Sequence, residues 1–333
     1  MSDLITLAHG AGGKQTAELI DRVFKAHFSN PQFTGDDAAV LPIGGTNLAF
    51  TTDGFIVSPP EFPGGNIGKL SICGTVNDLS CMGAKPLYLS CAFVIEEGFP
   101  MEKVEAYAKA MAETAAEAGV RIVAGDTKVA ARSGRPPVHY DDRHRPNHGR
   151  CPNVGHAGQT GRCIIVSGDV GRHGCTILLE RNQFGIDADV TSDCAPLWGT
   201  VESMLNTTKD IHVIRDATRG GVGTVLYEIA AQSKVGIHLD SQAIPVDPAV
   251  RGVCGMLGLE PLYLACEGRL VIVAPKEVAG DIVAVLKKGK YSQNAAIIGE
   301  VTEEQPGRVV MRTEIGAEML LPPPGGELLP RIC

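Results

Sequence analysis

The sequence predicts an α+β protein of two domains. Its 333 residues exceed what a single hydrophobic core usually organises, so two domains of ordinary size are expected. With 44% hydrophobic and 20% charged residues, the chain has a globular composition. Helical and strand patterns mix in both halves without the strict alternation of a doubly wound sheet. This mixture favours two α+β sandwiches, over residues 1–155 and 160–316, joined near 150–162.

The elements follow from the spacing of apolar residues. Helical periodicity runs over 14–28, through Leu19, Val23, Phe24 and Phe28, and again over 101–118 and 276–288. A further helix is expected at 224–232, after a glycine-rich turn. Short apolar runs predict strands at 48–52, 87–95, 121–125, 163–168, 269–274 and 295–301.

Charge and cysteine usage narrow the class of protein. A net charge of -8 argues against nonspecific binding to nucleic acid or anionic membranes, both of which need a basic surface. No charged-then-apolar leader opens the chain and no apolar run approaches 18 residues, so we expect a cytoplasmic protein without a membrane segment. The ten cysteines lack C-x-x-C spacing, and most are expected to be small buried hydrophobic residues.

Cys333 is the exception, because a chain end is rarely buried. Residues 317–333 include LPPPGGELLPRIC, in which three prolines favour polyproline II and Gly325-Gly326 provide a hinge. We therefore expect a mobile tail with the thiol at its tip. The thiol is either a neutral chain end or a chemical handle.

Acidic residues beside Gly or Thr recur along the chain. They are Asp36, Asp37, Asp53, Asp78, Asp126 and Asp216. One such Asp is an ordinary turn former or helix cap, but the repeated pattern indicates a shared role. Carboxylates at strand ends hold Mg²⁺ against a polyphosphate, and neighbouring glycines let backbone N–H groups approach phosphate oxygens.

Two glycine-rich segments fit the same interpretation. The first is AHGAGGK, where Gly10, Gly12 and Gly13 form a loop before a helix and Lys14 is placed to meet a phosphate, although the spacing is not that of a Walker P-loop. The second is DATRGGVG, where Arg219 precedes a helix start that favours anions. The alternative interpretation of DATRGGVG is an ordinary helix start that binds no anion.

Longer stretches carry a resemblance to a known family. They are FPGGNIGKLSICGTVNDLSCMGAKPLYLS at 62–90, AGDTKV at 124–129, RDATRGGV at 215–222, PAVRGVCGMLGLEPL at 248–262 and the terminal PRIC. The chain resembles the HypE family of hydrogenase expression/formation proteins. This family belongs to the PurM-like superfamily of aminoimidazole-ribonucleotide synthetase, selenophosphate synthetase and thiamine-monophosphate kinase.

The resemblance implies a fold, an activity and partners. It implies a homodimer whose N-terminal sheets pair into a β-barrel, a C-terminal α/β sandwich, and ATP with Mg²⁺ bound between domains and across subunits. A HypF-type carbamoyltransferase would place a carbamoyl group on Cys333. The chain would dehydrate it to a thiocyanate with ATP and pass the cyano group to iron on a HypC–HypD complex.

The resemblance also implies roles for single residues. Asp53, Asp78, Asp126 and Asp216 would bind Mg²⁺ through the ATP phosphates, with Thr127 beside them. Lys128 and His173 match positions used for activity, and Glu267 would be the base that takes the amide proton. Cys266 stands where the family usually has Asn. The structural alternative to a role in activity is a surface salt bridge in the case of Lys128. In the case of His173 it is a position next to a helix N-cap.

Residues 131–162 depart from the family pattern. They contain no Ile, Leu, Met, Phe or Trp but include His139, His144, His148 and His156. Three interpretations compete: a Zn²⁺ or Ni²⁺ site that uses His144, His148, Cys151 and His156, a disordered basic surface loop, and a stretch that was read in the wrong frame. We favour the last. It predicts that an N-terminal strand is lost, and resequencing the gene tests it.

Two rival functions remain at this point. Another ATP-dependent synthetase is one, but selenophosphate synthetase typically has a reactive residue in the N-terminal glycine-rich loop, which here contains no cysteine. The other is a non-catalytic carrier whose proline-rich tail is grasped by a partner. Turnover of ATP by the carbamoylated protein would exclude the carrier.

Overall fold

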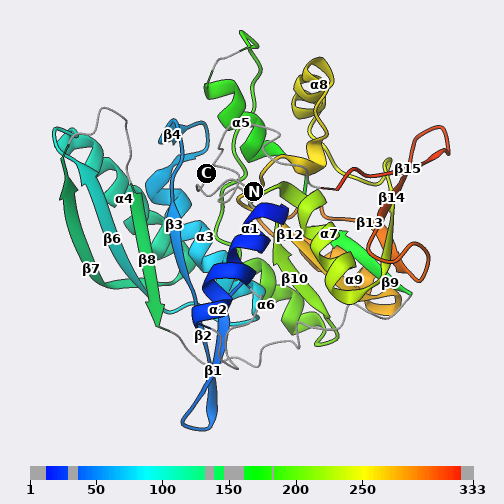
Figure 1. Ribbon diagram of the computed structural model, residues 1–333, viewed down its shortest axis with the longest axis horizontal. Coiled ribbons are helices and arrows are strands. Elements are labelled where there is room, and N and C mark those ends of the chain that lie inside the picture. The colour runs from blue at the N-terminus through cyan, green and yellow to red at the C-terminus, as the bar shows by residue number, and fades with distance from the viewer. Residues whose placement is uncertain (1–12, 29–36, 132–138, 146–160, 182–183, 324–333) are drawn as a thin grey trace.

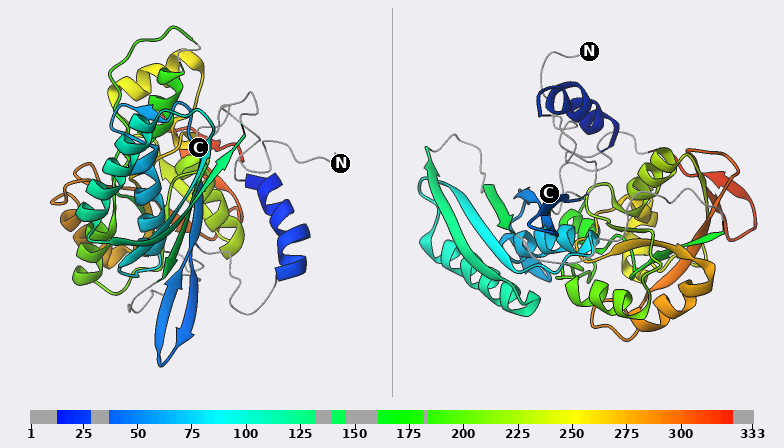
Figure 2. Two further views of the ribbon diagram at one scale, coloured as in Figure 1. Left: turned by 90° about the vertical axis from the view of Figure 1, so that its left-hand side faces the viewer. Right: turned by 90° about the horizontal axis from the view of Figure 1, so that it is seen from below.

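The computed structural model describes residues 13–28, 37–131, 139–145, 161–181 and 184–323. Two domains lie side by side, each with its own sheet (Figure 1). A helical segment at the N-terminus stands on the outside of both (Figure 2). It consists of α1 (Gly13–Leu19), a π-helical turn (Ile20–Phe24) and α2 (Lys25–Phe28), which confirms the helix expected over 14–28. Its apolar residues Val23, Phe24 and Phe28 are exposed.

The first domain is built on a four-stranded sheet of order β3-β8-β6-β7. The strands are β3 (Thr52–Phe55), β8 (His139–Arg145), β6 (Tyr88–Glu96) and β7 (Arg121–Ala130). α4 (Met101–Ala118) crosses from β6 to the parallel β7, and α3 (Ile67–Cys81) packs beside α4. Two hairpins lie outside this sheet: β1 (Ala39–Ile43) with β2 (Thr46–Phe50) before β3, and β4 (Glu61–Phe62) with β5 (Gly65–Asn66) after it.

The second domain is built on a seven-stranded sheet of order β10-β12-β9-β13-β11-β14-β15. The strands are β9 (Arg162–Val166), β10 (Val213–Asp216), β11 (Gly236–Asp240), β12 (Leu270–Pro275), β13 (Ala296–Thr302), β14 (Val309–Arg312) and β15 (Glu318–Leu320). The helices are α5 (Arg172–Glu180), α6 (Trp198–Thr207), α7 (Gly221–Ser233), α8 (Pro248–Leu257), the 3₁₀ turn η3 (Pro261–Tyr263) and α9 (Lys276–Leu286).

Both faces of this larger sheet are covered by helices. Because side chains alternate along a strand, Ile164 of β9 faces a core shared with α7, whereas Ile165 faces one shared with α6 and α9. Strands buried on both faces read as continuous apolar runs. This is why CIIVSG and RLVIVA were recognisable as strands from the sequence.

Helix α3 lies at the junction of the two domains. Thirteen of its fifteen residues are buried, and it contacts β3 and α4 of its own domain as well as β10 and α6 of the other. The side chain of Asn66 caps its first turn by accepting from the Lys69 N–H at 3.1 Å. Gly68 lets α4 approach, because a Cβ there would lie 2.3 Å from the carbonyl oxygen of Tyr107.

Some expectations from the sequence need correction. The tail does not begin at 317, because β15 pairs with β14 and Leu321 fills the core next to α7. Residues 324–333, including Cys333, lie outside the described residues. The strand expected to be missing from the segment 131–162 is present as β8, between β3 and β6. Within the described chain no helix is long and apolar enough to cross a membrane.

Candidate functional site

Four carboxylates gather at the junction between the domains. Asp37 precedes β1, Asp53 lies in β3, Asp78 lies in the last turn of α3, and Asp216 ends β10. The pKa of Asp78 is raised well above its usual value by burial and then by the charges of Asp53, Asp216 and Asp37. The sequence placed these residues at strand ends or in turns, which is wrong for Asp53 and Asp78. The structure nevertheless brings them together.

Arginine and hydroxyl groups border this acidic cluster. Arg215 Nε lies 2.8 Å from Asp37 Oδ1, and the Thr51 hydroxyl is within 3.1 Å of Asp78 Oδ2. Burial and the charge of Asp37 raise the pKa of Asp216 to about 8, while Arg215 and the exposed Arg219 oppose the rise. The cluster therefore carries more negative potential than its own cations neutralise.

That excess negative potential fits a divalent cation. Carboxylate oxygens are the ligands that Mg²⁺ prefers, with phosphate oxygens and water completing the shell. Among the described residues, no three acidic, His or Cys side chains form a closed metal-binding group. The arrangement suits an ion that arrives with a polyphosphate, for which Asp53, Asp78 and Asp216 are the candidate ligands.

The backbone of Glu267 is linked to the helix that carries Asp78. Glu267 lies between η3 and β12 and is only 3% exposed. Asp193 fixes the loop by accepting from the N–H groups of Glu267 at 3.2 Å and Gly268 at 3.3 Å. Only glycine fits at 268, because a Cβ there would lie 1.9 Å from the Asp193 carbonyl oxygen. Asn77, adjacent to Asp78, donates to the Glu267 carbonyl oxygen at 3.3 Å.

Cys266 is a buried hydrogen-bonding residue. Its Sγ accepts from the Gly171 N–H at 3.1 Å and lies 3.6 Å from the Leu264 carbonyl oxygen, to which it donates. Burial raises its pKa well above the usual value, so the sulfur stays protonated. The thiol thus bonds to backbone groups on both sides of the loop, as a side-chain amide can.

His173 lies apart from the acidic cluster. It is fully buried in the first turn of α5, with Nδ1 2.8 Å from the Ser192 hydroxyl and its ring edge-on to Phe62 at 5.2 Å. Burial lowers its pKa to about 3, so the imidazole is neutral. Nε2 has no hydrogen-bond partner among the described residues. This environment leaves both the catalytic and the structural interpretation of His173 open.

The AGDTKV residues are not part of the cluster within one chain. Asp126, Thr127 and Lys128 lie in β7, at the edge of the sheet opposite β3 and Asp53. Lys128 Nζ lies 2.6 Å from Asp126 Oδ2, and both side chains are more than half exposed. The expectation that Asp126 joins Asp53, Asp78 and Asp216 is therefore wrong for a single chain.

The structure describes only part of the N-terminal glycine-rich segment that the sequence predicts to bind phosphate. Gly10, Gly12 and Asp36 lie outside the described residues. Gly13 begins α1 and Lys14 follows in its first turn, so these two belong to the helix rather than to the preceding loop.

Sequence reasoning missed several residues that build the site: Thr51, Asn77, Asp193 and Arg215. Asn77 and Arg215 are direct neighbours of predicted aspartates, which was an available signal. Asp193 and Thr51 carried no local signal, because their role depends on contacts with distant segments.

Comparison with known proteins assigns the family. The family models for the N-terminal and C-terminal domains of AIR synthase related protein match residues 35–140 and 159–312. The carbamoyl dehydratase HypE of Escherichia coli K12 is 44% identical over 99% of both chains. A crystal structure of a HypE–HypF complex has a TM-score of 0.85 and 40% identity, covering 92% of this chain and 99% of that one.

A structure of hydrogenase maturation protein HypE in complex with ATP has a TM-score of 0.81 and 42% identity, covering 99% of this chain and all of that one. These similarities extend over both domains. The chain belongs to the HypE family, within the AIR synthase related proteins of PurM-like fold.

Proposed function

We propose that this chain is an ATP-dependent carbamoyl dehydratase that serves [NiFe]-hydrogenase maturation in the cytoplasm. The full-length similarity to carbamoyl dehydratase HypE carries the proposal. The acidic cluster at the domain junction supports it independently. The substrate is the thiocarboxamide formed on Cys333 by a HypF-type carbamoyltransferase, and the product is a thiocyanate donated to iron on a HypC–HypD complex.

The reaction needs activation of a poor leaving group. The thiocarboxamide oxygen attacks the γ-phosphorus of ATP, and ADP departs. Loss of the two N–H protons then forms the C≡N bond as the C–O bond breaks, and the oxygen leaves within inorganic phosphate. The balance is R–S–C(O)NH₂ plus ATP to R–S–C≡N plus ADP and phosphate, without a redox change.

The residues divide into two groups for this chemistry. Asp53, Asp78 and Asp216 would hold Mg²⁺, which supplies charge neutralisation at the transferring phosphoryl group when bound. Glu267 is the base for the amide protons, because its loop is fixed by Asp193 and Asn77 and excluded from water. A thiol suits the carrier role because sulfur can deliver the cyano carbon and depart as thiolate.

A homodimer would bring Lys128 to this site. β7 is an edge strand, and its apolar side chains Ile122, Val123 and Val129 are 40%, 61% and 67% exposed. An exposed apolar edge is a template for pairing with another chain. Pairing of the N-terminal sheets into a barrel would bury this edge and place Lys128 of one copy against the acidic cluster of the other.

Stimulated ATP turnover tests the proposal. The chain carbamoylated on Cys333 should release one phosphate per thiocyanate formed. The Cys333→Ser variant should release none above background. Equal turnover by both proteins would contradict the proposal, and turnover by neither would favour the non-catalytic carrier.

A further inference from the structure

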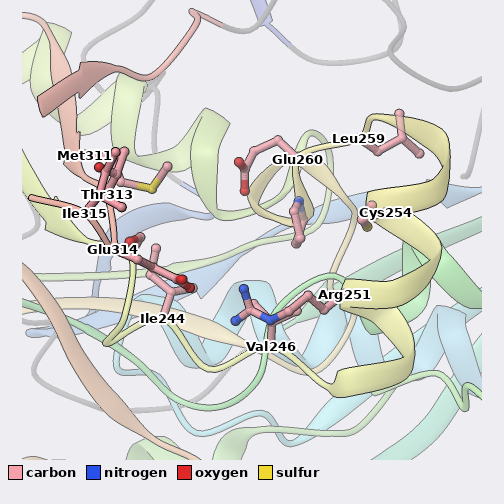
Figure 3. A pocket seen from close by; sticks show the side chains of 13 residues that line it. Ile244, Val246, Arg251, Cys254, Leu259, Glu260, Met311, Thr313, Glu314 and Ile315 are labelled. Carbon is pink, nitrogen blue, oxygen red and sulfur yellow. The ribbon is translucent and has the colours of Figure 1, made fainter. Parts of the chain in front are cut away.

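A groove in the second domain lies outside the acidic cluster and the Glu267 loop. It is a cavity of about 410 Å³ between α8 and the segments that follow β11 and β14 (Figure 3). We call it the α8 groove. Its apolar lining includes Ile244, Val246, Leu259, Met311 and Ile315. Ile315 is 91% exposed at the rim of the groove.

The α8 groove also carries charges of both signs. The side chains of Arg251 from α8 and Glu260 from the following turn point into it, and Glu314 lines the opposite side (Figure 3). The Arg251 side chain makes no hydrogen bond or ion pair within the described part of the chain, although its charge attracts Glu260. A guanidinium in this position is available to a carboxylate, which it binds with two parallel hydrogen bonds.

The C-terminal tail leaves the domain beside the α8 groove. Leu321 is buried, and the Tyr263 hydroxyl donates to the Pro322 carbonyl oxygen. Tyr263 ends the η3 turn, whose first residue Pro261 lines the groove. Ten residues follow Pro323, and an extended chain covers about 3.3 Å per residue, so the tail can reach about 33 Å. The groove is well within that reach.

The sequence of the tail complements the groove. Residues 324–333 read PGGELLPRIC, with two leucines and an isoleucine for the apolar lining. Arg331 matches the acidic pair Glu260 and Glu314, and the terminal carboxylate of Cys333 matches Arg251. A cation and a carboxylate two residues apart fit a groove that presents charges of both signs.

We propose that the α8 groove is a docking site for the C-terminal residues 327–333 of the same chain. Docking there holds the Cys333 thiol away from the acidic cluster and from Glu267 while the thiol is unmodified. The docked tail must leave the groove before its carrier function can begin. That consequence rests on the proposed dehydratase function, whereas the docking itself does not.

Photo-crosslinking in the full-length protein tests the docking without ATP or any partner. p-Benzoylphenylalanine replaces Ile315 at the groove rim, and a matched variant carries it at Met101, which is 71% exposed at the start of α4 in the other domain. A mixture of ¹⁴N- and ¹⁵N-labelled protein is irradiated and digested, and the crosslinked peptides are identified by mass spectrometry. The isotope pattern separates crosslinks within a chain from those between copies.

The expected result is a crosslink from position 315 to residues 327–333 of the same chain, at least fivefold above that from position 101. Arg251→Gln added to the Ile315 variant should lower the yield severalfold, whereas Lys288→Gln, the same charge loss at an exposed residue of the second domain, should not. Equal tail yields from positions 315 and 101, tail crosslinks only between copies, or none from position 315 would overturn the proposal. None of these results depends on dehydratase activity, so the two proposals fail separately.

Discussion

The side chain of Asn77 connects the two domains to each other at Glu267. Asn77 Nδ2 donates to the carbonyl oxygens of Glu267 at 3.3 Å and Ala195 at 3.1 Å, and Oδ1 accepts from the Leu197 N–H at 2.8 Å. Asn77 belongs to α3 of the first domain, and its three partners belong to the second. Because Asp78 follows it directly, one helical turn positions both the acidic cluster and the loop of the base.

Asn77→Ala should destabilise the protein, because the buried Ala195 carbonyl oxygen and Leu197 N–H lose this partner. The Glu267 carbonyl oxygen keeps a longer bond of 3.5 Å from the Ala195 N–H. Leaving buried polar groups unsatisfied costs about 1–3 kcal/mol each, so we expect a loss of about 3 kcal/mol in the free energy of unfolding after partial relaxation. Urea unfolding followed by circular dichroism measures it. Asn206→Ala, at an exposed position in α6, is the control and should change stability little. A loss below about 1 kcal/mol would show that Asn77 does not fasten the domains.

The stability of the nucleotide-free protein should fall as pH rises from about 5 to 8. The pKa of Asp216 is about 8 in the folded protein, mainly through burial and the charge of Asp37, against an ordinary value of 3.8 for an aspartate. Between these values the native state binds more protons than the unfolded state, so raising the pH favours unfolding. Asp216→Asn should flatten this part of the melting temperature–pH profile. Asp281→Asn, at an exposed position in α9, should leave it unchanged. A wild-type profile that rises over this interval would contradict the assignment.

Glu267→Gln should separate the two chemical steps. The substitution keeps the size of the side chain and the backbone contacts to Asp193 and Asn77, but it removes the proton acceptor. We expect carbamoylation of Cys333 at the wild-type rate and a loss of thiocyanate formation of about 100-fold or more, the usual contribution of a general base. Glu300→Gln, in β13 of the same domain, is the matched control. Normal dehydration by Glu267→Gln would exclude Glu267 as the base.

Mixing two inactive variants tests whether the site spans the dimer. If Lys128 acts on the acidic cluster of the other copy, Lys128→Ala and Glu267→Gln lie in different halves of each site. Refolding or exchanging the two variants together should then restore about a quarter of wild-type activity, because half of the dimers are mixed and each has one intact site. Recovery of no activity, with subunit exchange shown by native mass spectrometry, would place Lys128 in the same site as its own Glu267.

Local patterns predicted the elements that have one buried face. The amphipathic α4 was predicted with its observed bounds, 101–118, because its apolar residues recur at helical spacing. α3 was missed for the opposite reason. It is buried nearly all round, so its sequence lacks a polar face, and its glycines resemble loop residues. A helix of this kind is defined by what packs around it, which a single sequence does not contain.

The residues of the site were likewise predicted where the local sequence marks them and missed where their role depends on distant contacts. Asp53, Asp78 and Asp216 were recognisable because carboxylates beside small residues recur along the chain. Asp126 carries the same local pattern, yet β7 holds it at the far edge of the sheet, and only the strand order reveals this. Asn77 and Asp193 act through long-range hydrogen bonds to backbone groups, so no spacing in the sequence could identify them.

Mass spectrometry of the C-terminal peptide tests the central claim most directly. The protein is incubated with a HypF-type carbamoyltransferase, its carbamoyl donor and then Mg-ATP. We predict a carbamoyl adduct on Cys333 that loses one water only after ATP is added. An unmodified Cys333, with the carbamoyltransferase shown to be active on another HypE protein, would contradict the claim that this thiol carries the substrate.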